Sequence, residues 1–168
     1  MKTKKIFLPS LIMGMFFIGI AFFLIINKIS MENFIKLLCI TLITSGTFDF
    51  INSKDKSLLK IKFLGKFFFT ISLVLNTKIL FVDNFLIFIL IILFEVLVSM
   101  VQIKKIKNAN KSTYKFLLTL NVLNILLIML LANKSLVAFI SLRNIFAFFY
   151  IFVGFTYIIY SFEDFLKI

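Results

Sequence analysis

The sequence contains no histidine and no tryptophan, only one cysteine and one proline, and only seven acidic residues. Without histidine, it lacks the commonest general base and metal ligand. A single cysteine, Cys39, excludes an intrachain disulfide and a thiolate metal cluster. No glycine-rich phosphate-binding loop is present, and the acidic residues do not cluster as metal ligands would. We therefore predict a protein that is not an enzyme and that has no catalytic residues, metal site or cofactor.

Polar side chains are scarce as well. Hydrophobic residues make up 62% of the 168 residues and charged residues 15%, with a mean hydropathy of +1.13. Soluble domains contain about 45–50% apolar and about 25% charged residues. Because this chain has too few polar residues to cover a water-soluble globule, we predict that a lipid bilayer surrounds most of its surface.

Six apolar segments approach or reach the length of about 17–25 residues that a spanning helix needs. They are Ile6–Ile26, Asn33–Ile51, Leu59–Leu75, Asn84–Val101, Phe116–Ala132 and Val137–Phe162. The first segment is longer than a signal-peptide core of about 7–15 residues, so we expect it to be retained. The third carries Lys60, Lys62 and Lys66, whose long stems can bring the ammonium groups to the interface. The predicted fold is all-α: a polytopic membrane helical bundle of six transmembrane helices, forming one integral membrane domain over residues 1–168.

The positions of the basic residues predict the orientation of this bundle. Fourteen of them fall on the side of the two termini and of the second and fourth connections: Lys2, Lys4, Lys5, Lys54, Lys56, Lys60, Lys62, Lys66, Lys104, Lys105, Lys107, Lys111, Lys115 and Lys167. Five fall on the other side: Lys28, Lys36, Lys78, Lys134 and Arg143. Since basic loops stay in the cytoplasm, both termini are predicted to be cytoplasmic, in the cell membrane. The net charge of +12 then suits anionic lipid headgroups at the cytoplasmic loops, not nucleic acid.

A short signature recurs where the first, third and fifth predicted helices end. Each copy has a leucine three residues before an asparagine, and the three asparagines are Asn27, Asn76 and Asn133. Asparagine suits a helix terminus because it tolerates the left-handed conformation. The recurrence predicts three repeated helical hairpins, each with its asparagine at the turn. A chance match of common residues is the alternative.

This arrangement resembles the HdeD-like family of small six-helix membrane proteins. The matching stretches are Leu24–Asn27 with Thr44–Thr47, and Leu130–Asn133 with Phe152–Phe155, where Gly46 and Gly154 occupy the centre of the second helix. The middle copy carries Glu95 where the family pattern has glycine. The resemblance implies a role in acid resistance or another stress response, and it supplies no catalytic residues.

Glu95 and Lys66 are candidate functional residues because a charge inside a membrane is costly. Glu95 lies about 13 Å and Lys66 about 9 Å inside the cytoplasmic boundary, at 1.5 Å per residue. The similar depths predict an intramembrane ion pair, which either fixes the helix register or takes part in proton transfer. In an alternative interpretation, Glu95 is unpaired, protonated and uncharged.

Four further polar residues have structural interpretations. Asn121 and Asn124 share a helix face and are predicted to form interhelical hydrogen bonds. Asp49 is predicted to be an interfacial group near Lys54 or Lys56. Arg143 is predicted to extend outward toward Glu32 or Asp83.

Two functions other than stress protection remain open. The size and helix number also suit a small substrate-binding subunit of a membrane transporter, although such a subunit should contain Gly- and Pro-broken segments. Alternatively, the chain is a membrane interaction or immunity protein that binds another helix bundle. The sequence also leaves open a homo-oligomer or a partner membrane protein.

Overall fold

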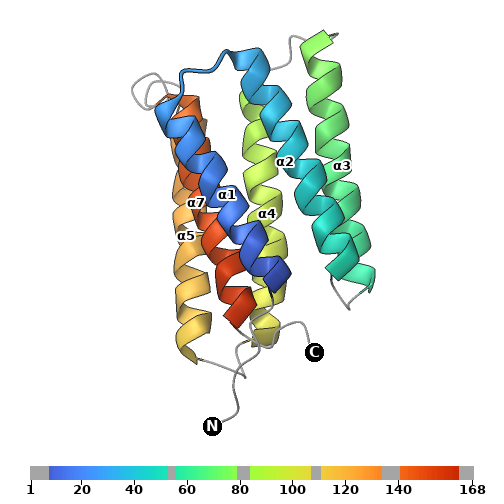
Figure 1. Cartoon of the computed structure of the whole chain (residues 1–168), viewed down its shortest axis with the longest axis vertical. Helices are drawn as coiled ribbons and strands as arrows, with labels where there is room; N and C mark the ends of the chain where they lie inside the picture. Colours follow the sequence, from blue (N-terminus) through green and yellow to red (C-terminus); the bar gives the residue numbers. More distant parts are fainter. Residues whose placement is uncertain (1–7, 53–55, 79–83, 107–110, 134–140, 163–168) are drawn as a thin grey trace.

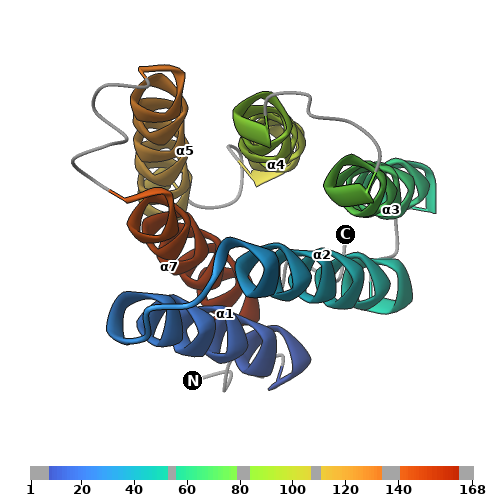
Figure 2. The same cartoon turned by 90° about the horizontal axis from the view of Figure 1, so that it is seen from above.

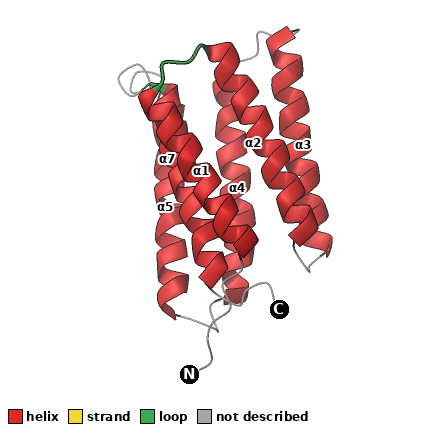
Figure 3. Ribbon diagram, in the orientation of Figure 1, coloured by secondary structure: helices red, strands yellow, loops and turns green. Residues whose placement is uncertain are grey.

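A computed structural model describes residues 8–52, 56–78, 84–106, 111–133 and 141–162, and their regular structure is entirely helical (Figure 3). The helices are α1 (Leu8–Ile26), α2 (Met31–Asn52), α3 (Lys56–Lys78), α4 (Asn84–Ile106), α5 (Lys111–Ala132) and α7 (Leu142–Phe162). The prediction of an all-α bundle with six long helices is confirmed. A helix suits lipid because it satisfies every backbone hydrogen bond within its own segment.

Three helices are longer than predicted where they run into lysine-rich sequence. The third helix covers Lys56–Lys78 instead of Leu59–Leu75, α4 continues to Ile106, and α5 begins at Lys111. Apolar composition identifies only the part of a helix that contacts lipid. The helical backbone continues beyond that part, among charged side chains. The last predicted span began at residue 137, but residues 137–140 lie outside the described part and α7 begins at Leu142.

The six helices run side by side in alternating directions (Figure 1). We call the lower end of Figure 1, where α1, α3 and α5 begin and α2, α4 and α7 end, the lower end of the bundle. The opposite end, where α2, α4 and α7 begin, is the upper end. The lower end corresponds to the side that the sequence predicts to be cytoplasmic.

The most extensive helix contacts are those of α1 with α7, α2 with α3 and α4 with α5 (Figure 2). In each of the last two pairs, the first helix ends and the second begins at the lower end, so the pair forms a hairpin. The repeat predicted a different pairing, in which α1 and α2 form the first hairpin, α3 and α4 the second, and α5 and α7 the third. Each helix therefore packs most closely against a helix of a different predicted hairpin. Sequence periodicity does not specify which neighbour a helix contacts.

Two glycines allow the close approach of α1 and α7. A Cβ atom added at Gly14 would lie 2.7 Å from the carbonyl oxygen of Gly154, and one added at Gly154 would lie 2.8 Å from the carbonyl oxygen of Gly14. By contrast, a Cβ atom at Gly19 would meet nothing within 4 Å. Small residues of this kind let helix backbones approach closely inside a membrane.

The three signature asparagines occupy different positions. Asn27 and Asn133 each follow directly after a helix, whereas Asn76 lies inside the last turn of α3 and does not form a turn. No described non-glycine residue has a positive φ, so the expected left-handed cap is not formed. Asn27 instead donates a side-chain hydrogen bond to the carbonyl oxygen of Phe23 at 3.0 Å, which satisfies an acceptor at the end of α1.

The outer surface is apolar on every described helix. Large hydrophobic side chains such as Met15, Leu64, Phe68 and Met129 are more than 60% exposed. Soluble monomers rarely expose apolar patches above a few hundred Å². Five helices, α1, α2, α4, α5 and α7, are long and apolar enough to cross a membrane, and α3 is not among them. The chain is thus a multi-pass membrane protein whose surface is suited to a lipid bilayer.

Candidate functional site

The inner face of α2 carries polar residues at regular helical spacing. Thr41, Ser45 and Asp49 are four residues apart and all are buried. The hydroxyl of Thr41 donates to the carbonyl oxygen of Leu38 at 2.8 Å, and that of Ser45 donates to the carbonyl oxygen of Leu42 at 3.1 Å. Because a hydroxyl can bond its own helix in this way, it can be buried at low cost.

The inner face of α3 repeats the pattern with charged groups. Lys62, Lys66 and Thr70 are also four residues apart and buried, and Lys66 is only 2% exposed. Thr70 donates to the carbonyl oxygen of Lys66 at 2.9 Å. The polar stripes of α2 and α3 face each other across the most extensive contact that α3 makes.

The two stripes meet in a cluster of four charges. The ammonium nitrogen of Lys66 lies 2.9 Å from Asp49 Oδ2 and 3.0 Å from Glu95 Oε1 of α4. The ammonium of Lys62 lies 3.6 Å from Asp49 Oδ2, and the hydroxyl of Tyr157 on α7 donates to Asp49 Oδ1 at 2.7 Å. Two carboxylates therefore face two ammonium groups, and the cluster has no net charge. It joins α2, α3, α4 and α7.

The structure brings together the two residues of the predicted ion pair, Glu95 and Lys66, but it adds a residue that the sequence interpretation had placed elsewhere. Asp49 points into the bundle, and its predicted partners, Lys54 and Lys56, lie outside the residues whose side chains are described. It is 7% exposed and shares Lys66 with Glu95. Counting residues from the end of α2 gave its depth but not the direction in which it points. The signal that could have identified it is its spacing from Thr41 and Ser45, which places all three on one helix face.

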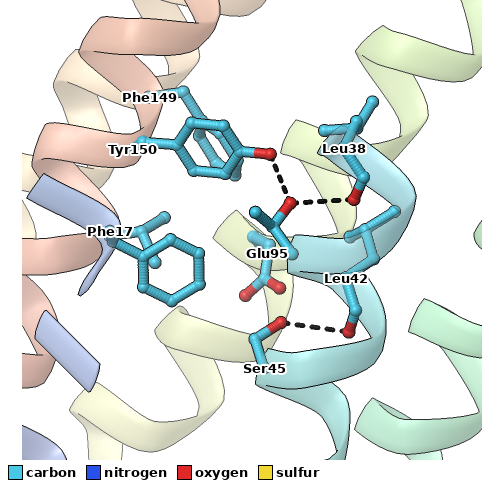
Figure 4. A pocket seen from close by; sticks show the side chains of 9 residues that line it. Phe17, Leu38, Leu42, Ser45, Glu95, Phe149 and Tyr150 are labelled. Carbon is cyan, nitrogen blue, oxygen red and sulfur yellow. Dashed lines mark hydrogen bonds between the residues drawn. The ribbon is translucent and has the colours of Figure 1, made fainter. Parts of the chain in front are cut away.

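A small cavity lies next to the charged cluster (Figure 4). Its volume is about 10 Å³, and its polar lining consists of Thr41, Ser45, Glu95 and Tyr150. The hydroxyls of Thr41 and Tyr150 lie 2.5 Å apart, and the carboxylate of Glu95 is directed toward Ser45 in Figure 4. None of the other lining residues, among them Phe17 and Phe149, has a polar side chain.

Above this polar region, three aromatic rings fill the upper part of the core. Phe34, Phe88 and Phe146 each lie within the first two turns of α2, α4 or α7, and none is more than 3% exposed. Their ring centroids are 5.2–5.9 Å apart, and every pair is arranged edge to face. We call these three residues the aromatic cluster. It separates the polar residues from the upper end of the bundle.

The remaining predicted contacts are found in part. Asn121 on α5 donates to the hydroxyl of Ser99 on α4 at 3.1 Å, whereas the buried oxygen of Asn124 accepts no hydrogen bond within the described residues. Arg143 does not extend to Glu32. It donates to the carbonyl oxygen of Asn27 at 2.8 Å and so ties α7 to the end of α1, while Glu32 pairs with Lys36. The other predicted partner, Asp83, lies outside the described residues.

The arrangement can hold four helices in register and can carry hydrogen bonds through the lower half of the core. Among the described residues, no three His, Cys, Asp or Glu side chains lie close enough to hold a metal ion. No protein-family model, curated protein or solved structure matches the chain.

Proposed function

We propose that this chain is a cell-membrane protein of six spans, with α3 as the sixth and with both termini in the cytoplasm. The six-span proposal rests on which face of α3 is turned toward the bundle interior. Lys62 and Lys66 point into the bundle, where Asp49 and Glu95 balance their charges. Intramembrane charges are tolerated when they face the bundle interior and pair with one another.

The opposite face of α3 supports the same proposal. Apart from Lys60, every exposed side chain that the structure describes on α3 is apolar: Ile61, Leu64, Phe67, Phe68, Ile71, Val74 and Leu75. Lys60 is exposed, but it lies one turn from the start of α3, where its stem can bring the ammonium to the headgroups. Hydropathy along the sequence averages both faces of a helix, whereas lipid contacts only one.

For the cellular role, we propose protection against acid or a related stress. The support is the resemblance of Leu24–Asn27 and Leu130–Asn133, with their following helices, to the HdeD-like pattern. The alternative of a transporter subunit is less well supported. Such a subunit should contain Gly- and Pro-broken segments, and the chain has only five glycines and one proline.

Acid survival of cells with and without the gene tests this role. We expect deletion to lower survival and the wild-type gene to restore it. Complementation with Glu95→Gln separates a role of the carboxylate from a structural one, and Glu32→Gln, which changes an exposed carboxylate, is the matched control. Equal survival of the deletion and wild-type cells would contradict a stress role. If a small molecule also co-purified at stoichiometric amounts, the transporter alternative would replace it.

A further inference from the structure

The polar groups around the cavity have already used their hydrogen-bond donors. Ser45 donates to the carbonyl oxygen of Leu42, and Thr41 donates to that of Leu38. A hydroxyl has a single hydrogen, so Tyr150 must be the donor in its 2.5 Å contact with Thr41. Glu95 offers only acceptors when ionised, and its contact with Lys66 uses Oε1. The lining therefore presents acceptors without donors, and what fits it is a small molecule or ion that donates.

The volume and the charge balance select among such donors. A cavity of about 10 Å³ is close to the smallest that holds one water molecule, and a water needs two to four polar partners. A metal cation would also bind acceptors. However, Asp49 and Glu95 are already balanced by Lys62 and Lys66, so a cation would leave an uncompensated buried charge. A neutral donor avoids this cost.

We propose that this cavity is a binding site for one water molecule, which lies beside Ser45 and donates to the Glu95 carboxylate and to the hydroxyl oxygen of Tyr150. The water joins the charged cluster to the Thr41–Tyr150 pair. Polar contacts then run without interruption from Lys62 and Asp49 near the lower end to Tyr150 in the middle of α7. They stop there, because the aromatic cluster fills the core above.

Radiolytic labelling of the full chain in lipid nanodiscs tests the proposal. X-rays generate hydroxyl radicals from water in place, so a buried side chain is oxidised when it touches a bound water. Tyr150 is 2% exposed and Phe146, one turn away in the aromatic cluster, is not exposed at all. We expect oxidation at Tyr150 well above that at Phe146. Equal oxidation of the two residues would overturn the proposal.

A cavity-filling variant provides the second comparison. Ser45→Val should displace the water and lower the labelling of Tyr150 to the level of Phe146. Thr44→Val, which changes the adjacent but exposed hydroxyl, should leave the labelling unchanged. Undiminished labelling in a folded Ser45→Val protein would contradict the site.

Should Ser45→Val fail to fold, an experimental map of the wild-type protein that resolves ordered water decides the question. The expected result is one density peak within hydrogen-bond distance of both Glu95 and Tyr150. An empty cavity, or a peak that anomalous scattering or elemental analysis identifies as a metal cation, would overturn the proposal.

Discussion

In the lower half of the bundle core, a cluster of charges and hydroxyls joins the helices, whereas in the upper half a cluster of three aromatic rings joins them. In the lower half, Lys66 contacts both Asp49 and Glu95 within 3.0 Å. In the upper half, Phe34, Phe88 and Phe146 pack edge to face. Both regions connect α2 and α4 to α7, one through charged and hydroxyl groups and the other through aromatic packing.

The difference lies in how each region responds to the loss of one member. A buried charge that loses its partner retains its full desolvation cost, so the lower half depends on every charge being matched. Aromatic packing is a sum of many small attractions and weakens gradually when one ring shrinks. We therefore expect a substitution in the lower half to cause a large loss of stability, which a second substitution that rebalances the charge restores. Substitutions in the upper half should cause smaller losses of stability that add to one another.

The largest effect is expected for Lys66→Met. It leaves the buried Asp49 and the partly buried Glu95 with only Lys62 as a counter-charge, and it should destabilise the protein by about 3–5 kcal/mol. Thermal unfolding in detergent can be followed with a thiol-reactive fluorophore, because Cys39 is the only cysteine and is buried.

Compensation makes this first prediction specific. In the double variant Lys66→Met, Glu95→Gln, Asp49 stays paired with Lys62 and the cluster again has no net charge, so much of the lost stability should return. Lys36→Met, which breaks the exposed pair with Glu32, is the control and should change stability by no more than about 1 kcal/mol. A double variant less stable than Lys66→Met would show that charge matching is not what stabilises the lower half.

The next largest effect concerns the contact between α1 and α7. Gly154→Ala places a methyl group 2.8 Å from the carbonyl oxygen of Gly14, so the helices must separate, at a cost of about 1–3 kcal/mol. Gly19→Ala is the matched control. It meets nothing within 4 Å, and the better helix propensity of alanine should leave the unfolding temperature equal or slightly higher. Equal destabilisation by both variants would argue against the close crossing.

In the aromatic cluster, Phe146→Leu should cost about 1–2 kcal/mol, because leucine retains most of the buried volume but loses the edge-to-face contacts. The same thermal assay measures it. Combined with Lys66→Met, its effect should add, since the two sites share no partner. A loss as large as that of Lys66→Met would contradict the contrast between the two halves.

The smallest effect is expected at the hydrogen bond between α4 and α5. Ser99→Ala removes the acceptor for Asn121 and should cost about 0.6 kcal/mol, the average for interhelical hydrogen bonds in membranes. Thr119→Val, on the exposed face of α5, is the control, because its hydroxyl bonds only to its own helix. A Ser99→Ala protein that unfolds several degrees earlier than this control would show that the contact is stronger than a typical one.

The sequence predicted the helices well and their neighbours poorly. Long apolar runs determine where a helix lies along the chain, and similar depth was enough to suggest that Glu95 and Lys66 meet. Depth alone could not reveal the rotation of each helix, so the sequence did not place Asp49 beside Lys66 or Arg143 beside the carbonyl oxygen of Asn27. The packing of α1 against α7 joins residues that are far apart in the sequence, and the spacing of the signature asparagines contains no information about it.

The crossing of α3 is the central claim, and thiol labelling from each side of the membrane in intact cells tests it directly. Single cysteines replace Lys56 and Lys78, the first and last residues of α3, in a Cys39→Ser background. If α3 spans the membrane, a membrane-impermeant maleimide should label Lys78→Cys from outside the cell and Lys56→Cys only after permeabilisation. Labelling of both positions from the same side would contradict the account.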